Sequence, residues 1–292
     1  MVAHAGPADP VEDLVGRRTW ARSILMTNRD DHAVAADLAT EAGALLLGVR
    51  EREGFGDAGA LRAKGDRASH EFLMEALARV RPDDCVLSEE ATREERLDPR
   101  RLRADRVWIV DPLDGTREFS EEGRSDWAVH VALWERDGKR DGKRDGEEGG
   151  RLTAGAVALP AQGRTLTTAE PPKLPAVPQG RFRIAVSRTR PPEFVQRLAE
   201  LVGADLVPIG SAGAKISAVL TGEAEAYVHA GGQYEWDSAA PVAVALAAGA
   251  HASRIDGSPP AYNQADPSLP DILVSLPDLA RSLLDGIRDL HR

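Results

Sequence analysis

The sequence is poor in cysteine and has no long apolar run. Cys85 is the single cysteine among 292 residues, so no disulfide can form within the chain and we expect a reducing compartment, the cytoplasm. Cys85 opens the apolar run CVLS, and we interpret it as a buried small hydrophobe in preference to a nucleophile. The apolar segment AAPVAVALAAGAHA is too short and too rich in alanine to span a bilayer, and the N-terminal MVAHAGPADPVEDLVGRR lacks the apolar core of a signal peptide. We therefore expect a soluble protein with no membrane partner.

Basic residues are scarcer than acidic ones. The chain has 37 Lys and Arg against 47 Asp and Glu, a formal net charge of −10. This balance argues against a general nucleic-acid binder, and the lack of a Walker-type phosphate loop argues against an NTPase. A small anionic substrate is still compatible, because a binding site can be locally cationic or filled with metal.

Three polar segments without periodicity divide the chain. Residues 1–30 are interpreted as a flexible N-terminal extension, the repetitive RDGKRDGKRDGEEGG at 136–150 as a disordered insertion at a hairpin tip, and the proline-rich 169–181 as a boundary. Between them we expect an N-terminal metal-binding lobe at 31–168 and a C-terminal lobe at 182–292. Helices precede strands in the first lobe, which indicates α+β, whereas strands and helices alternate in the second, which indicates α/β. The fold class as a whole is α/β.

The segment WAVHVALW at 127–134 is apolar at both its odd and its even positions. This pattern is typical of a strand that is covered on both faces. His130 lies inside it, and we interpret His130 as a satisfied core histidine in preference to a metal ligand.

Acidic side chains stand where predicted strands end. Glu89 follows CVLS, Asp111 and Asp114 follow RVWIV, and Asp237 stands at the start of a predicted helix. Several acids brought together would repel one another unless a cation neutralised them. Hard oxygen ligands with no nearby Cys and no His-rich spacing favour Mg²⁺ over Zn²⁺. Two such ions that share Asp111, about 3.5–4 Å apart, would clamp a phosphate.

Gly115 and Thr116 fit the same chemistry, because a glycine lets the backbone approach a phosphate and a threonine hydroxyl orients a water. Each motif alone also has a structural interpretation. DPLDGT is then a solvated turn or a helix cap, SEE an exposed helix start, and WDSAA a helix with Asp237 as its N-cap. The occurrence of all three in one chain favours the functional interpretation.

LSEEA, WIVDPLDGT and EWDSAAP occur in the order that is typical of the inositol monophosphatase superfamily, and the sequence resembles this family from about residue 31 to its end. The resemblance implies a layered α-β-α-β-α sandwich with the site between the lobes. It also implies lithium-sensitive catalysis with two or three Mg²⁺ ions per site, and homodimerisation.

The resemblance further implies a role for each acid. Glu89, Asp111 and the carbonyl of Leu113 would hold one ion, with Asp111 shared between two, and Asp114 and Asp237 would hold the second.

Three residues would be catalytic by the same resemblance: Glu89, together with Thr116 and Asp66, which position and activate the attacking water. The family usually has a Thr-x-x-Asp-like stretch where this chain has Ala63 to Asp66. The alternative interpretation of Asp66 is therefore the N-cap of the helix that follows.

DGTREF is similar to the DGTKEF of the CysQ-type 3′-phosphoadenosine 5′-phosphate (PAP) phosphatases, and HAGGQYEWDSAAP resembles actinobacterial CysQ proteins in particular. The resemblance implies removal of the 3′-phosphate of PAP in sulfur assimilation, with inositol 1-phosphate or fructose 1,6-bisphosphate as alternative substrates. The residues that would contact substrate are Gly115, Thr116, Ser187, Arg188, Gly210, Ser211, Lys215 and Asp237.

Lys215 or Arg188 would supply the cation that a second phosphate requires. The spacing from Gly210 to Lys215 is one residue longer than in the usual Gly-Ser-Ser-Leu-Lys. The alternative for Lys215 is an exposed helix lysine.

Two other classes of protein are alternatives. Haloacid-dehalogenase phosphatases also place acids after a strand, but one residue separates their two acids and the first is a covalent nucleophile, whereas two residues separate Asp111 from Asp114. A metal- or nucleotide-sensing module without turnover is the second alternative, although the expected carboxylates and Thr116 are all present.

Overall fold

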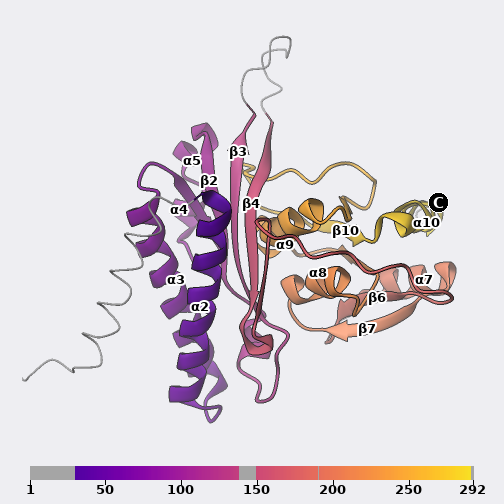
Figure 1. The fold of residues 1–292 in the computed structure, drawn as a ribbon, viewed down its shortest axis with the longest axis horizontal. Coiled ribbons are helices and arrows are strands. Elements are labelled where there is room, and N and C mark those ends of the chain that lie inside the picture. The colour runs from indigo at the N-terminus through magenta and orange to yellow at the C-terminus, as the bar shows by residue number, and fades with distance from the viewer. Residues whose placement is uncertain (1–29, 138–148, 190, 291–292) are drawn as a thin grey trace, which may run out of the picture.

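The computed structural model describes residues 30–137, 149–189 and 191–290, and its helices and sheets alternate in layers (Figure 1). Helices α2 and α3 form one outer layer and α7 and α10 the other; the two sheets lie inside them, with α8 and α9 in the middle. The predicted α-β-α-β-α sandwich is confirmed. The six helices of these layers are α2 (Asp31–Glu53), α3 (Ala58–Val80), α7 (Glu193–Val202), α8 (Ala212–Thr221), α9 (Glu235–Ala247) and α10 (Pro277–Leu290).

The first sheet has the strand order β1-β2-β3-β4-β5, with β1 parallel to β2 and the other neighbours antiparallel. β1 is thus an edge strand, and its Cys85 is only partly buried, less than the sequence predicted. The bounds are β1 (Cys85–Ser88), β2 (Arg106–Asp114), β3 (Ala128–Arg136), β4 (Gly150–Leu159) and β5 (Arg164–Thr167). Short helices lie between or after these strands: α4 (Arg93–Arg96), α5 (Pro99–Arg103), α6 (Thr116–Phe119) and the 3₁₀ turn η1 (Pro160–Gln162).

Strand β3 is covered on both faces, as its sequence predicted. Val129, Val131 and Leu133 belong to the core under α2 and α3, whereas Ala128 and Ala132 belong to the core around α8 and α9. Because side chains alternate along a strand, His130 faces the α8 and α9 side.

The second sheet has the order β7-β6-β8-β10-β9, with β7, β6 and β8 parallel and the rest antiparallel. Its strands are β6 (Arg183–Ser187), β7 (Asp205–Ile209), β8 (Ala226–Ala230), β9 (His251–Ser253) and β10 (Asp271–Ser275). Helices α8 and α9 pack between the two sheets, so one core contains residues from both halves of the chain. The lobe boundaries 31–168 and 182–292 therefore stay a prediction.

Helix α2 is long and apolar enough, by length and composition, to cross a membrane, whereas the sequence was expected to contain no such segment. Eight of its residues are nevertheless buried, and it packs against β3, β4 and β5 as a core helix. Its N-cap is Asp30, whose carboxylate accepts a hydrogen bond from the amide of Ala33 at 2.8 Å.

Two predicted polar segments fall largely outside the described residues. Of the extension at 1–30 the structure describes only Asp30, and of the insertion at 136–150 it describes only the two ends. Those ends are not irregular: Arg136 pairs with Gly150 as β3 and β4 continue. The predicted insertion is therefore too long by at least one residue at each end, because the strand ladder extends into it.

Candidate active site

A β-bulge at the end of β2 brings Asp111 and Asp114 to the same place. On β3, Asp111 pairs with His130 but Asp114 pairs with Ala128, so β2 contains one residue more than its partner. Residues three apart in a regular strand point to opposite faces, and the extra residue restores the same face. β2 thus runs four residues further than the sequence predicted, and Asp111 and Asp114 point together toward the middle layer.

Three carboxylates converge there. Oxygen atoms of Asp111, Asp114 and Asp237 lie within 4.8 Å of one another, and Glu89 adjoins Asp111 at the end of β1. The side chains of Asp111 and Asp114 are only 1% and 7% exposed, so water screens their repulsion poorly. An all-oxygen donor set of like charge, largely buried, fits a hard divalent cation such as Mg²⁺.

The electrostatics of the site show how strongly these acids oppose one another. Burial, together with Glu89 and Asp114, raises the pKa of Asp111 well above its usual range. Burial and neighbouring acids raise the pKa values of Glu89 and Asp237 to about 7. Burial alone would raise the pKa of Asp114 as well, but His130, the amide of Gly213 and Lys215 outweigh it and lower that pKa. Asp114 is therefore the acid that stays ionised before a cation arrives.

These raised pKa values predict how Mg²⁺ stabilises the protein at different pH. The folded, metal-free protein holds protons on Glu89 and Asp237 that the unfolded chain releases, so its stability falls as the pH rises from about 5 to about 8. Saturating Mg²⁺ should raise Tm by about 5 °C at about pH 8 and by clearly less at about pH 5.5, where protons compete with the ion. Thermal unfolding with Mg²⁺ and with EDTA checks this, and an equal shift at both pH values would contradict it.

Asp66 lies inside α3 and is not a helix cap; Asp57 is the N-cap of that helix. Gly65 packs so tightly against the strand end that a Cβ there would lie 2.6 Å from the ring of Phe119 and 3.0 Å from Leu113. The tight contact holds this turn of α3 beside the acid cluster. Burial and the charge of Glu90 raise the pKa of Asp66 to about 7, which suits a group that accepts a proton from water.

Gly115 and Thr116 form the turn between β2 and α6. Gly115 has φ 85°, and a Cβ there would lie 2.8 Å from Cβ of Ser211, so only glycine allows this turn to approach the start of α8. The hydroxyl of Thr116 donates to the carbonyl of Leu113 at 3.3 Å. That carbonyl is the backbone ligand that the sequence predicted.

Asp237 is the third residue of α9, not its N-cap. Tyr234 occupies the cap position, and the carboxylate of Asp237 accepts from the amide of Tyr234 at 2.7 Å. The interpretation of Asp237 as the N-cap is therefore wrong, although its carboxylate still accepts from the amide of the cap residue.

The predicted substrate loop at Gly210 and Ser211 begins α8. Ser211 is the N-cap, accepting from the amide of Ala214 at 2.9 Å. The amides of Ala212 and Gly213 point at Asp114, at 3.2 and 2.5 Å. The loop thus contributes to the site through its backbone, because the start of a helix presents unpaired amides.

Lys215 is buried, 5% exposed, and is not an exposed helix lysine. Its Nζ donates to the carbonyl of Gly210 at 2.5 Å and lies 5.4 Å from the ring centre of Tyr227. Burial lowers the pKa of Lys215, although Asp114, Glu118 and Asp237 partly offset the effect. Lys215 therefore adds positive charge behind the loop.

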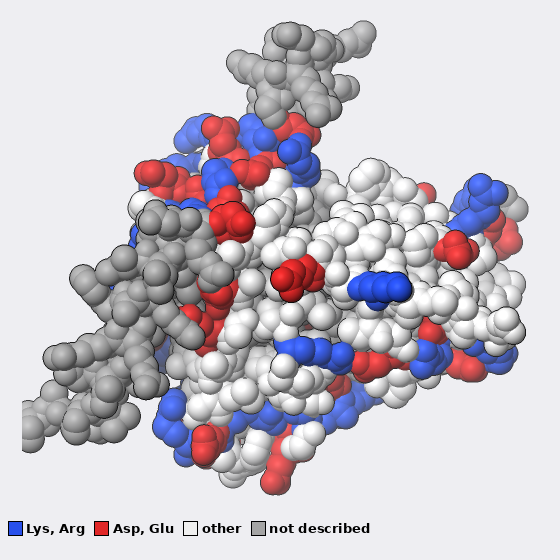
Figure 2. Space-filling view, in the orientation of Figure 1, with Lys and Arg blue, Asp and Glu red and all other residues white. Residues whose placement is uncertain are grey.

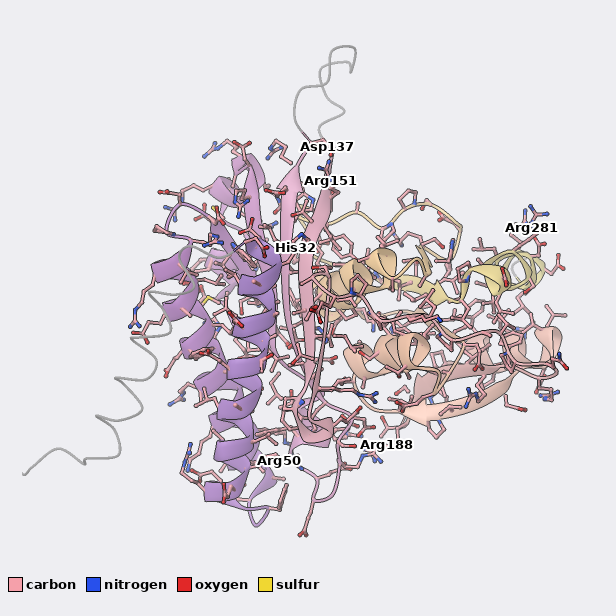
Figure 3. All side chains as sticks on the ribbon, in the orientation of Figure 1. His32, Arg50, Asp137, Arg151, Arg188 and Arg281 are labelled. Atoms are coloured by element: carbon pink, nitrogen blue, oxygen red, sulfur yellow. The ribbon has the colours of Figure 1, made fainter. Side chains whose placement is uncertain are left out.

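Arg188, labelled in Figure 3, directly follows β6 and is already paired with acids. Its guanidinium donates to Glu118 and to Glu121, at 2.9 Å in each case. Glu118 belongs to the REF stretch that follows DGT, and it is 6% exposed. No pattern in the sequence predicted this pairing. Because of it, a second phosphate would have to compete with two carboxylates for Arg188. Ser187 ends β6 next to it and is half-buried.

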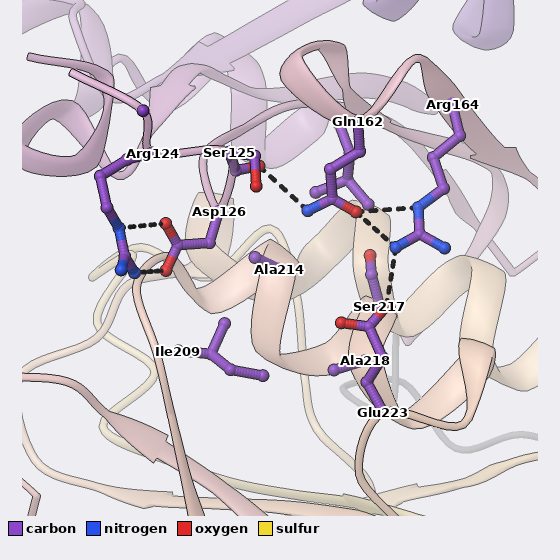
Figure 4. A pocket seen from close by; sticks show the side chains of 12 residues that line it. Arg124, Ser125, Asp126, Gln162, Arg164, Ile209, Ala214, Ser217, Ala218 and Glu223 are labelled. Atoms are coloured by element: carbon purple, nitrogen blue, oxygen red, sulfur yellow. Dashed lines mark hydrogen bonds and ion pairs between the residues drawn. The ribbon is translucent and has the colours of Figure 1, made fainter. Parts of the chain in front are cut away.

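A cavity of about 230 Å³ lies behind the substrate loop, between the segment from Gly123 to Asp126 and α8 (Figure 4). Asp126 connects the two places, because its carboxylate accepts from the amide of Gly210 at 2.7 Å and pairs with Arg124. None of the predicted metal ligands lines this cavity. The cavity therefore lies outside the acid cluster.

Known proteins resemble the chain over most of its length. The model of the inositol monophosphatase family matches residues 28–283. A 3′-phosphoadenosine 5′-phosphate phosphatase from Mycobacterium leprae is 52% identical over 264 residues, which are 89% of this chain and 94% of that protein. The 3′(2′),5′-bisphosphate nucleotidase CysQ from Escherichia coli strain K12 is 32% identical over 215 residues, 68% of this chain and 77% of that protein.

Solved structures agree in fold. Mycobacterium tuberculosis SuhB superposes with a TM-score of 0.61 at 25% identity and covers 88% of this chain and 95% of its own. Inositol monophosphatase II from Staphylococcus aureus superposes with a TM-score of 0.65 at 23% identity, covering 87% and 92%. The second likeness is one of fold alone.

Proposed function

Because the chain belongs to the inositol monophosphatase family, we propose that it is a Mg²⁺-dependent phosphomonoesterase that removes the 3′-phosphate of PAP to give AMP and phosphate. The observation that carries the proposal is the 52% identity to a protein of that activity, over nearly the full length of both. The convergence of Asp111, Asp114 and Asp237 supports the metal dependence.

In this proposal some residues of the site hold the metal ions and others act on the attacking water. Glu89, Asp111, Asp114, Asp237 and the carbonyl of Leu113 hold the ions, which when bound would neutralise charge on the phosphoryl group and the departing oxygen. Asp66 and Thr116 act on the attacking water. The hydroxyl of Thr116, which is fixed by its hydrogen bond to the carbonyl of Leu113, orients the water. Asp66 accepts a proton from that water. No covalent intermediate on the protein is required.

Positive charge on the substrate side suits a second phosphate. Lys215 is fixed behind the Gly210 loop by its hydrogen bond to that carbonyl. Arg188 is held by Glu118 and Glu121, and we propose that it turns from Glu121 toward the 5′-phosphate when substrate binds. Acidic and basic side chains are interspersed on the face shown in Figure 2. Because the chain has a formal net charge of −10, we propose no nucleic-acid partner.

Release of phosphate from four substrates tests the proposal. With Mg²⁺, PAP or its sulfated form should have the highest kcat/KM, above inositol 1-phosphate and fructose 1,6-bisphosphate. Li⁺ should inhibit, and EDTA should abolish turnover. A higher kcat/KM for inositol 1-phosphate would contradict the substrate assignment but not the chemistry, whereas trapping of an aspartyl-phosphate would contradict the direct attack of water.

We propose a cytoplasmic location, in agreement with the single cysteine, and a place in sulfur assimilation. We also propose that the protein forms a homodimer, as the resemblance implies.

A further inference from the structure

His130 lies at the centre of the acid cluster without being one of its acids. It is fully buried in β3 and stands directly opposite Asp111 on the neighbouring strand. Its Nδ1 lies 3.0 Å from the carbonyl of Trp236, the residue before Asp237. Its Nε2 lies 3.2 Å from Oδ2 of Asp114. His130 therefore adjoins two proposed metal ligands, Asp111 and Asp114, and the residue that precedes a third, Asp237.

The contact of His130 through Nδ1 has an unambiguous direction. The carbonyl of Trp236 accepts only, so Nδ1 donates to it and fixes the plane of the ring. Nε2 makes no aligned hydrogen bond to another described residue, and the carboxylate of Asp114 is the acceptor it faces in an ion-pair contact. With Nδ1 donating, Nε2 carries a proton only when the ring is an imidazolium, and in that form it is the donor that the buried carboxylate of Asp114 faces.

The backbone around His130 leaves room for the ring and little more. A Cβ on Gly213 would lie 2.0 Å from Nε2 and 3.0 Å from Oδ2 of Asp114. The missing side chain at Gly213 therefore provides the space in which the ring meets the carboxylate. The amide of Gly213 donates to the same Oδ2 at 2.5 Å, so this oxygen is held from two directions.

We infer that His130 is a positioning residue that fixes the carboxylate of Asp114 relative to the first turn of α9, and so sets the geometry of the ion site shared by Asp114 and Asp237. In this role His130 binds the ion and the substrate only indirectly, through Asp114. Groups that orient a metal-binding carboxylate typically change metal affinity about 10–100-fold when they are removed. The inference rests on the proposed metal-dependent function, but it concerns the binding of the ion and not the identity of the substrate.

Two substitutions by amide side chains of different length test the two contacts of His130 separately. In His130→Asn the side-chain amide reaches the position of Nδ1 and keeps the Trp236 bond, whereas in His130→Gln it reaches the position of Nε2 and keeps a donor toward Asp114. Calorimetric titration of the metal-free, full-length protein with Mn²⁺ should show His130→Gln within about threefold of wild type. His130→Asn and His130→Leu should bind at least one ion about 10–100-fold more weakly.

The outcomes separate positioning from folding. Circular dichroism and Tm of the metal-free variants establish that they are folded, and if His130→Leu is not, the Gln and Asn variants decide. Equal Mn²⁺ affinity in both amide variants, whether weakened or like wild type, would overturn the inference. A wild-type protein that binds Mn²⁺ but does not cleave PAP would refute the proposed substrate and leave the role of His130 standing.

Discussion

Replacing Asp114 by Asn should leave the protein folded and reduce kcat about a thousandfold or more. Asp114 stays ionised where its neighbours are driven toward protonation, because His130, the amide of Gly213 and Lys215 favour its charge. The neutral amide cannot replace this charge at an ion, and loss of a correctly held ion removes several kcal/mol of transition-state stabilisation, about a factor of a thousand in rate.

The fold should tolerate this change because two effects oppose each other. The variant loses one negative charge from a cluster of like charges, which is favourable, while the new NH₂ group faces the amide of Ala212 where a carboxylate oxygen accepted at 3.2 Å. Steady-state kinetics with PAP, with Tm of the metal-free protein, checks the prediction. Asp205→Asn, the same change at an exposed position on β7, is the control. A fully active Asp114→Asn protein would remove Asp114 from the metal site.

Replacing Asp66 by Asn should reduce kcat about 10²–10⁴-fold, the usual contribution of a positioned general base. The prediction rests on the place of Asp66 in α3, on the tight packing of Gly65 against Phe119, and on a pKa that burial and Glu90 raise to about 7. Asn is nearly isosteric and keeps the helix, but it cannot accept the proton of the attacking water.

Metal binding distinguishes this role from ligation. Asp66→Asn should bind the first Mn²⁺ ions with nearly wild-type affinity although its turnover is lost, whereas Asp114→Asn should lose both. Glu71→Gln, an exposed acid on the same helix, is the matched control. Turnover of Asp66→Asn within about twofold of wild type would mean that another group accepts the proton.

Most of the architecture was predictable because local patterns determine it. The alternation in WAVHVALW predicted a strand covered on both faces, and the two sets of positions do enter separate cores. The acids were predictable as well, since a carboxylate directly after a buried strand is held by the sheet at its edge. What the pattern did not reveal is the bulge after Asp111, because an extra residue in a ladder depends on the partner strand, not on the strand that contains it.

Local patterns do not indicate contacts between distant segments. Arg188 pairs with Glu118 across 70 positions of sequence, and no local spacing indicates such a pair. The burial of Lys215, in contrast, could have been predicted from the sequence. AGAKISAVL is apolar or small on every side of α8 except at the lysine and the serine, which is typical of a helix in a middle layer. A single lysine in such a helix is buried and must find an acceptor, as Lys215 does at Gly210.

The products that the purified protein forms from PAP and Mg²⁺ test the proposed activity most directly. Chromatography of the nucleotides, with phosphate measured in parallel, should show AMP and phosphate appearing in equal amounts and no adenosine 3′-phosphate. EDTA should stop the reaction, and fresh Mg²⁺ should restore it. Release of the 5′-phosphate, or no turnover of PAP under conditions in which Mg²⁺ stabilises the fold, would contradict the proposed function.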